Sequence, residues 1–211
     1  MTITLDLNKN SGVALDLTKN SPNLKNVKVL LNWDEHPVHG ANMTQGFDLD
    51  LWAFALNSSQ KVSTLDQICY FNNMNLYNGA VVLPRDNRTG VGDDDEEILI
   101  NLDKIPADIS SVVIYAFIYE GQKRGQNFGM VANANVKIIN VDTNDIIAQY
   151  NITQNFNGQT AICLGAIDKN SFTPDGGAGV MEPNEVMHTI LNWEEKSSPF
   201  NLGGNNVTTT F

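Results

Sequence analysis

The sequence is poor in cysteine and has no long apolar run, and each shortage excludes a class of protein. Its two cysteines, Cys69 and Cys163, lie in apolar segments, so we expect buried free thiols, although one disulfide stays possible. No apolar run is long enough to cross a bilayer. The first residues, Met1 to Leu7, show neither the basic nor the apolar region of a signal peptide. We therefore expect a cytoplasmic protein.

Basic residues are also scarce. Lysine and arginine number 13 against 24 aspartates and glutamates, which gives a formal net charge of −11. Phosphate backbones and anionic lipids repel such a surface, so we expect no nucleic-acid partner and no direct membrane insertion. The same charge favours solubility and the binding of cations.

Catalytic signatures are missing as well. The sequence has no Gly-x-Ser-x-Gly elbow, no Walker A motif and no dinucleotide-binding glycine pattern. His36 and His39 enclose Pro37 and lack the spacing of a zinc-binding helix. We therefore expect a non-enzymatic protein.

Short apolar runs separated by turn signals make up most of the chain. β-branched and aromatic residues fill these runs, Asn-Gly pairs at 78–79 and 157–158 separate some of them, and no long apolar period of 3.6 residues appears. This pattern predicts an all-β protein, an antiparallel β-sandwich of two packed sheets. The run 47–56 alternates at first and is then apolar on both faces, as in a strand buried between layers.

The chain divides into two parts of different character. Residues 1–170 have one uniform composition, which predicts a single sandwich domain. Within it, segments 3–7 and 13–17 enclose a turn signal and predict a hairpin. Residues 171–211 form a variable tail, in which 182–191 could be a short helix packed on the sandwich.

The segment from Asp86 to Glu97 is the strongest functional signal. It holds six carboxylates, one amide and two glycines, with Arg88 as the only opposing side-chain charge. Crowded carboxylates raise one another's pKa unless a cation lies among them, and calcium takes many oxygen ligands in loose geometry. Gly90 and Gly92 would let the backbone turn its carbonyls inward. A solvated acidic run is the alternative, but the glycine spacing and the apolar strand pattern that follows favour the metal site.

Further acids stand near this segment in the expected fold. Asp48 and Asp50 share one strand face with Trp52, and unpaired acids on a half-buried face are costly unless a cation or several donors lie nearby. Asp34 and Glu120 end two other strands and are weaker candidates. Arg88 stands where an EF-hand needs a ligand, and the flanks are strands, so the pattern is not that of an EF-hand.

Five motifs, in order, resemble the TerD family over roughly residues 10 to 165. They are Asn32-Trp33-Asp34, Phe47-Asp48-Leu49-Asp50, Tyr70-Phe71-Asn72-Asn73, the segment from Asp86 to Glu97, and Gln126-Asn127-Phe128-Gly129. The resemblance implies a calcium-binding β-sandwich of a bacterial stress module linked to tellurite resistance, phage inhibition and colicin tolerance, with no established enzymatic activity.

Carried over by position, the resemblance implies a ligand set for one or two calcium ions. The set comprises Asp86, Asn87, the carbonyls near Gly90 and Gly92, Asp93, Asp95, Glu96 and Glu97, with Asp48 and Asp50 from the neighbouring strand and Asp34 and Glu120 as weaker members. Asp94 replaces the family's usual glycine and Glu96 its usual aspartate, which alters loop geometry and ligand reach.

The resulting expectation is a calcium-binding, non-enzymatic stress-response protein. Calcium would order an interaction surface for other proteins of a stress-response assembly. The alternative is a calcium-dependent carbohydrate-binding or glycosidase β-sandwich, which would need an aromatic sugar platform beside the metal and a route of secretion.

Overall fold

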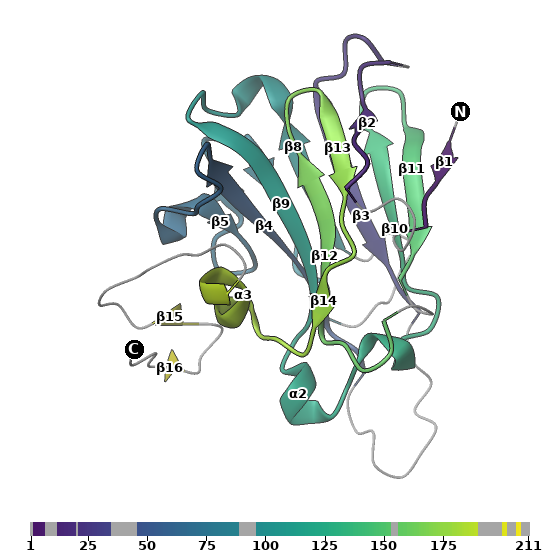
Figure 1. Ribbon diagram of the computed structural model, residues 1–211, viewed down its shortest axis with the longest axis vertical. Coiled ribbons are helices and arrows are strands. Elements are labelled where there is room, and N and C mark those ends of the chain that lie inside the picture. The colour runs from purple at the N-terminus through teal and green to yellow at the C-terminus, as the bar shows by residue number, and fades with distance from the viewer. Residues whose placement is uncertain are drawn as a thin grey trace.

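The computed structural model shows two β-sheets packed face to face, with short helices at one end and on one face (Figure 1). This confirms the predicted all-β sandwich. The structure describes residues 2–6, 12–19, 21–34, 46–88, 96–152, 156–189, 200–201 and 206–207.

The first sheet has the strand order β1-β11-β10-β3-β8-β7-β6. Its strands are β1 (Ile3–Thr4), β3 (Asn26–Asn32), β6 (Asn75–Leu76), β7 (Val81–Val82), β8 (Glu96–Asn101), β10 (Asn135–Asn140) and β11 (Asp145–Asn151). Neighbouring strands run antiparallel except β1 and β11, which are parallel. Buried and half-buried residues alternate along β8, so Glu96, Ile98 and Ile100 all face the core.

The second sheet has the order β2-β13-β12-β9-β4-β5, and β14 also pairs with β12. Its strands are β2 (Leu15–Asp16), β4 (Leu49–Asn57), β5 (Ile68–Cys69), β9 (Ile109–Ile118), β12 (Ala161–Ile167), β13 (Ser171–Pro174) and β14 (Ala178–Gly179). The remaining elements are η1 (Leu65–Gln67), η2 (Leu102–Lys104), η3 (Phe128–Met130), α2 (Gly121–Arg124), α3 (Pro183–Thr189), and a separate pair, β15 (Phe200–Asn201) and β16 (Asn206–Val207).

The second sheet is buried on both faces at β4. Leu49, Leu51 and other alternate residues of β4 belong to the main core between the sheets. Trp52 and Phe54 face the other way and belong to a second cluster, which also contains buried residues of α3. The run that is apolar on both faces is therefore a strand between two layers, as the sequence predicted, with α3 lying over its outer face (Figure 1).

The predicted hairpin between residues 3–7 and 13–17 is wrong. β1 pairs with β11 of the first sheet, whereas β2 pairs with β13 of the second. Two-residue strands have too few hydrogen bonds to hold each other, and each instead extends a longer strand that is already in place. Leu5 and Leu17 are both buried, so the two segments contribute to the same core from different sheets.

The chain continues to build the sandwich beyond residue 170. β13 and β14 both pair with β12, and α3 falls within the range 182–191 for which the sequence predicted a helix. The division at residue 170 stays a prediction about domain organisation. Cys69 and Cys163 are free and buried, as expected. Among the described helices, none is both long and apolar enough to cross a membrane.

Candidate metal centre

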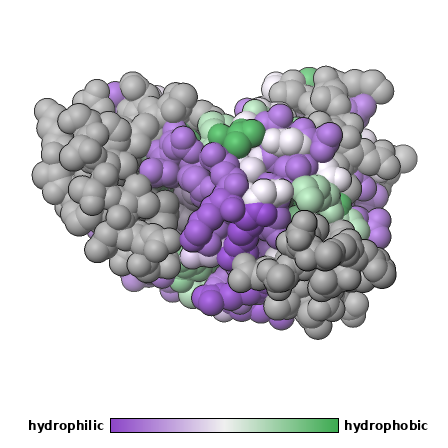
Figure 2. Space-filling view, turned by 90° about the horizontal axis from the view of Figure 1, so that it is seen from below, coloured by the Kyte–Doolittle hydropathy of each residue, from purple (hydrophilic) through white to green (hydrophobic). Residues whose placement is uncertain are grey.

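The candidate site lies where the two sheets meet along the starts of β4 and β8. β5 pairs with Ala53 and Phe54 of β4, so the first residues of β4 extend beyond that partner. The backbone N–H of Leu51 instead donates a hydrogen bond to Glu96 Oε2, across from the other sheet. The side chain of Glu96 therefore joins the two layers at this edge. Figure 2 views the end of the sandwich that carries α2 and shows hydrophilic residues across the middle of that face.

Three carboxylates converge at this edge. Oxygens of Asp50 in β4, Asp86 after β7 and Glu96 in β8 all lie within 4.8 Å of one another. Asp50 and Glu96 are almost completely buried, at 5% and 1% exposure of the whole residue. Arg88, whose side chain is largely exposed, forms an ion pair with Asp86, with 3.0 Å between its Nε and Asp86 Oδ2. Three separate chain segments thus place carboxylate oxygens around one point.

Asp48 adds a fourth carboxylate beside this trio. The backbone N–H of Tyr119 donates a 2.9 Å hydrogen bond to the Asp48 carbonyl, which fixes the start of β4 against the end of β9. A cavity of about 300 Å³ opens beside these groups. Its lining comprises Asp48, Asp50, Phe71, Asn72, Asp86, Arg88, Tyr119 and Arg124. Arg124 of α2 was not among the expected site residues, because nothing in the sequence indicates that α2 folds back beside β4.

The electrostatics of the site oppose full ionisation. Burial raises the pKa of Asp48 to about 6, with repulsion from Asp86 adding to the shift. Burial also raises the pKa of Asp50 well above its usual value, and the nearby charge of Asp48 adds to it. The pKa of Glu96 is raised in the same way by burial and by Asp50. Without a bound cation the site must therefore retain protons or bear the cost of buried, mutually repelling charges.

The donor set fits a calcium ion. Two ligands on opposite sides of calcium are separated by about 5 Å, twice a calcium–oxygen distance, so the trio can face one ion. Asp48 Oδ1 and Glu96 Oε1 are buried oxygens that accept no hydrogen bond within the described chain. Buried acceptors are normally satisfied, and a metal ion would satisfy both. Calcium would supply two positive charges, against which these acids could stay ionised.

The structure places the other predicted ligands in different surroundings. Glu97 faces away from Glu96 and forms an ion pair with Lys28, with 3.1 Å between Nζ and Oε2. Asp34 is exposed and accepts a 2.6 Å hydrogen bond from Asn133.

Glu120 also lies outside the trio. It forms ion pairs with Lys123 at 2.8 Å and Arg124 at 3.7 Å. Asn87 follows Asp86 in the chain and is half-buried. The four remaining predicted ligands lie outside the described residues: Gly90, Gly92, Asp93 and Asp95.

Comparison with known proteins decides the family. The TerD domain model matches residues 1–172. The chain belongs to the TerD family. It is 36% identical to general stress protein 16U of Bacillus subtilis (strain 168) over 170 residues, which is 80% of this chain and 86% of the relative. It is 35% identical to the tellurium resistance protein TerD of Serratia marcescens, over 80% of this chain and 85% of that protein.

A solved structure of another protein has the same fold. The crystal structure of a homologue of telluride resistance protein (TerD) from Streptomyces coelicolor A3(2) aligns with a TM-score of 0.62 at 20% identity, covering 80% of this chain and 98% of that one. At this identity the likeness establishes the TerD sandwich alone. Support for a metal site comes from the geometry of this chain's own carboxylates.

Proposed function

We propose that this TerD-family protein binds calcium at the edge between its sheets and acts, without catalysis, as an ion-ordered interaction module in the bacterial stress response. The buried trio of Asp50, Asp86 and Glu96 carries the proposal, because its oxygens lie within 4.8 Å of one another. Acids buried this closely are costly without a cation among them.

Binding would act on the fold through the chain segments that supply the ligands. Asp50 belongs to the second sheet and Glu96 to the first, while Asp86 precedes the rest of the acidic segment. A shared ion would hold these segments together and neutralise their repulsion, so that the end of the sandwich near α2 becomes one defined surface. Such a surface suits recognition by other proteins of a stress-response assembly in the cytoplasm.

The relatives support the biological setting. Proteins named for general stress and for tellurium resistance match this chain over 80% of its length. We extend that setting to this chain as a role in stress tolerance. Cys69 and Cys163 do not point to direct tellurite chemistry, because burial raises the pKa of each thiol to about 12 and disfavours the reactive thiolate.

Adjacent glutamates provide a matched test of the site. Glu96→Gln changes a carboxylate of the trio, whereas Glu97→Gln changes one paired with Lys28 on the opposite strand face. In calcium titrations by isothermal calorimetry we expect Glu96→Gln to weaken binding at least about a hundredfold, because a ligand charge is lost. We expect Glu97→Gln to bind within about threefold of the parent protein.

Two outcomes would contradict the proposal. One is calcium affinity in Glu96→Gln equal to that of the parent, with far-ultraviolet circular dichroism confirming the fold. The other is absence of heat or saturation in the parent protein. Asp50→Asn serves as a second variant of the trio, and the stoichiometry of the parent titration shows whether one or two ions bind.

A further inference from the structure

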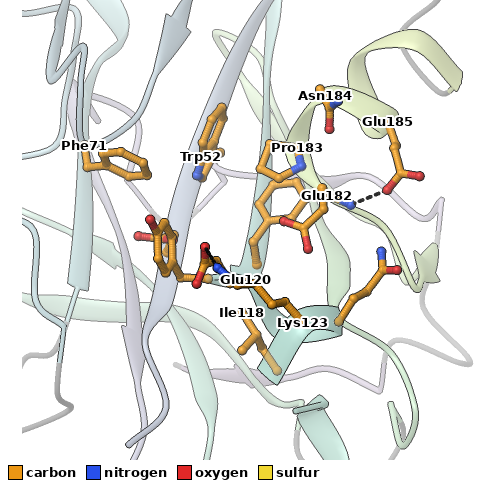
Figure 3. Close-up of a pocket in the computed structure, with 13 residues that line it drawn as sticks. Trp52, Phe71, Ile118, Glu120, Lys123, Glu182, Pro183, Asn184 and Glu185 are labelled. Atoms are coloured by element: carbon orange, nitrogen blue, oxygen red, sulfur yellow. Dashed lines mark hydrogen bonds and ion pairs between the residues drawn. The ribbon is translucent and has the colours of Figure 1, made fainter. Parts of the chain in front are cut away.

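A second cavity, of about 380 Å³, lies between the outer face of the second sheet and the start of α3. Figure 3 shows Trp52 and Phe71 on one side, Pro183 and Glu182 on the other, and Ile118 and Lys123 below. Phe117 and Tyr119 also line it, so much of the wall is aromatic or apolar. Its volume falls in the range of small-molecule sites.

Acidic groups give this cavity its charge. Asp50, Glu120, Glu182 and Glu185 line it, and Lys123 is the one basic residue among the described residues of the lining. Lys123 is already engaged, because its Nζ lies 2.8 Å from Glu120 Oε1. The cavity therefore has an excess of negative charge after that ion pair is counted.

Glu182 is the least compensated of these acids. Its backbone N–H donates a 2.7 Å hydrogen bond to Glu185 Oε2, which brings the second acid close. In the described chain no lysine or arginine forms an ion pair with either of them. Asp50, at 5% exposure, also lies in the wall, but as a member of the carboxylate trio it belongs to the candidate metal centre. Glu182 is half-buried beside aromatic side chains, and a cation bound in the cavity would compensate the cost of its charge.

We propose that this cavity binds a small organic cation, a primary ammonium group on an apolar body. The aromatic side chains of Trp52 and Phe117 in the wall suit the hydrocarbon part of such a cation, and Glu182 would accept a charge-assisted hydrogen bond from the ammonium group. A hard metal ion would instead require oxygen ligands on all sides, whereas one side of the described wall is aromatic. The negative charge excludes an anion.

The occupant is a free small molecule rather than a side chain of a partner protein. The cavity extends from Glu182 inward to Asp50, and its wall includes the almost fully buried Trp52 and Phe117. Because Asp50, Phe71 and Tyr119 also line the cavity beside the metal centre, the two sites are neighbours. The amine site nevertheless depends on Glu182, which lies outside the carboxylate trio.

The test compares three probes of one shape on the full-length protein. n-Hexylamine, 1-hexanol and hexanoate are titrated at pH 8 with calcium held constant, and binding is followed by NMR chemical shifts of the Trp52 indole. We expect saturable binding of hexylamine, with an affinity at least about tenfold above that of hexanol, and no binding of hexanoate. Equal affinity for hexylamine and hexanol would overturn the proposal without any variant being made.

Two variants locate the site. Glu182→Gln keeps the shape of the side chain and removes its charge, so we expect hexylamine affinity to fall about tenfold while hexanol affinity stays unchanged. Glu97→Gln is the control and should bind hexylamine as the parent does. An unchanged affinity in Glu182→Gln would overturn the proposal, and so would tighter binding of a lysine-containing peptide than of hexylamine.

Calcium titration of the same protein keeps this inference separate from the proposed function. Glu182→Gln should bind calcium as the parent does, because the residue is not in the trio. If Glu182→Gln lost amine binding but kept calcium binding, the second cavity would be identified as the amine site. Failure of the parent protein to bind calcium would contradict the metal proposal and leave the comparison of hexylamine with hexanol fully interpretable.

Discussion

At the scale of single residues, neighbours of the same type have different physical roles. Glu96 is buried beside Asp50 and Asp86, whereas the adjacent Glu97 is half-buried and paired with Lys28. Glu120 forms ion pairs with two basic residues of α2, whereas Glu182 forms none with the described lysines and arginines and is repelled by Glu185 and Glu120. Charge alone therefore does not indicate function, and the surroundings of each carboxylate determine what it can bind.

Glu182 makes stability depend on pH in a defined direction. Burial, with repulsion from Glu185 and Glu120, raises its pKa from 4.5 to about 7. The folded state thus binds this proton more tightly than the unfolded state, so the group disfavours folding increasingly as pH rises from 4.5 to 7. Because solvent screening limits the penalty to roughly 1 kcal/mol, we expect Glu182→Gln to melt about 2–4 °C higher than the parent at pH 8.

The pH comparison contains its own control. At pH 4, below both pKa values, the carboxyl group is mostly protonated in both states, so parent and Glu182→Gln should melt together in thermal scans followed by circular dichroism. A variant that gains stability equally at both pH values would show that the effect comes from packing and not from the charge of Glu182.

At the scale of elements, α3 packs as a cover on the second sheet. Val186 and Met187 are fully buried in the cluster that contains Trp52 and Phe54. The start of the helix also forms one wall of the second cavity, the one lined by Glu182. The helix has few residues and could not be stable alone. Its position therefore depends on these two apolar side chains.

Met187→Ala tests this attachment. Removing a buried methionine side chain typically costs about 2–5 kcal/mol, so we expect a clear loss in urea denaturation midpoint. Met130→Ala is the matched control, because Met130 is 36% exposed and should change stability by less than about 0.5 kcal/mol. Equal effects of the two substitutions would mean that α3 does not hold the outer face of the sheet.

Local patterns predicted the elements better than they predicted element partners. The apolar run around Trp52 correctly indicated a strand between two layers, because burial on both faces leaves a sequence signal. The prediction of a hairpin between residues 3–7 and 13–17 was wrong, because pairing depends on which strand edges are free in the finished sandwich. Asp48 and Asp50 were found from alternation, but Arg124 was missed because its place depends on the turn after β9.

At the scale of the whole molecule, the edge that carries Asp50, Asp86 and Glu96 connects the two layers of the sandwich. Asp50 and Glu96 lie in different sheets, and their mutual repulsion opposes close approach of the starts of β4 and β8. An ion between them would convert that repulsion into attraction. Global stability should therefore respond to calcium, and the response should depend on the trio.

The melting temperature provides the measurement. A ligand that binds only the folded state stabilises it by about 2.7 kcal/mol at one hundred times its dissociation constant, which corresponds to roughly 5–10 °C for a chain of this size. We expect that rise in calcium relative to chelator in the parent protein and in Glu97→Gln, and none in Glu96→Gln. In chelator, Glu96→Gln should melt at or above the parent, because the buried repulsion with Asp50 is relieved. Only a site built from buried acids gives both results together; a calcium response that survives in Glu96→Gln would place the ion elsewhere.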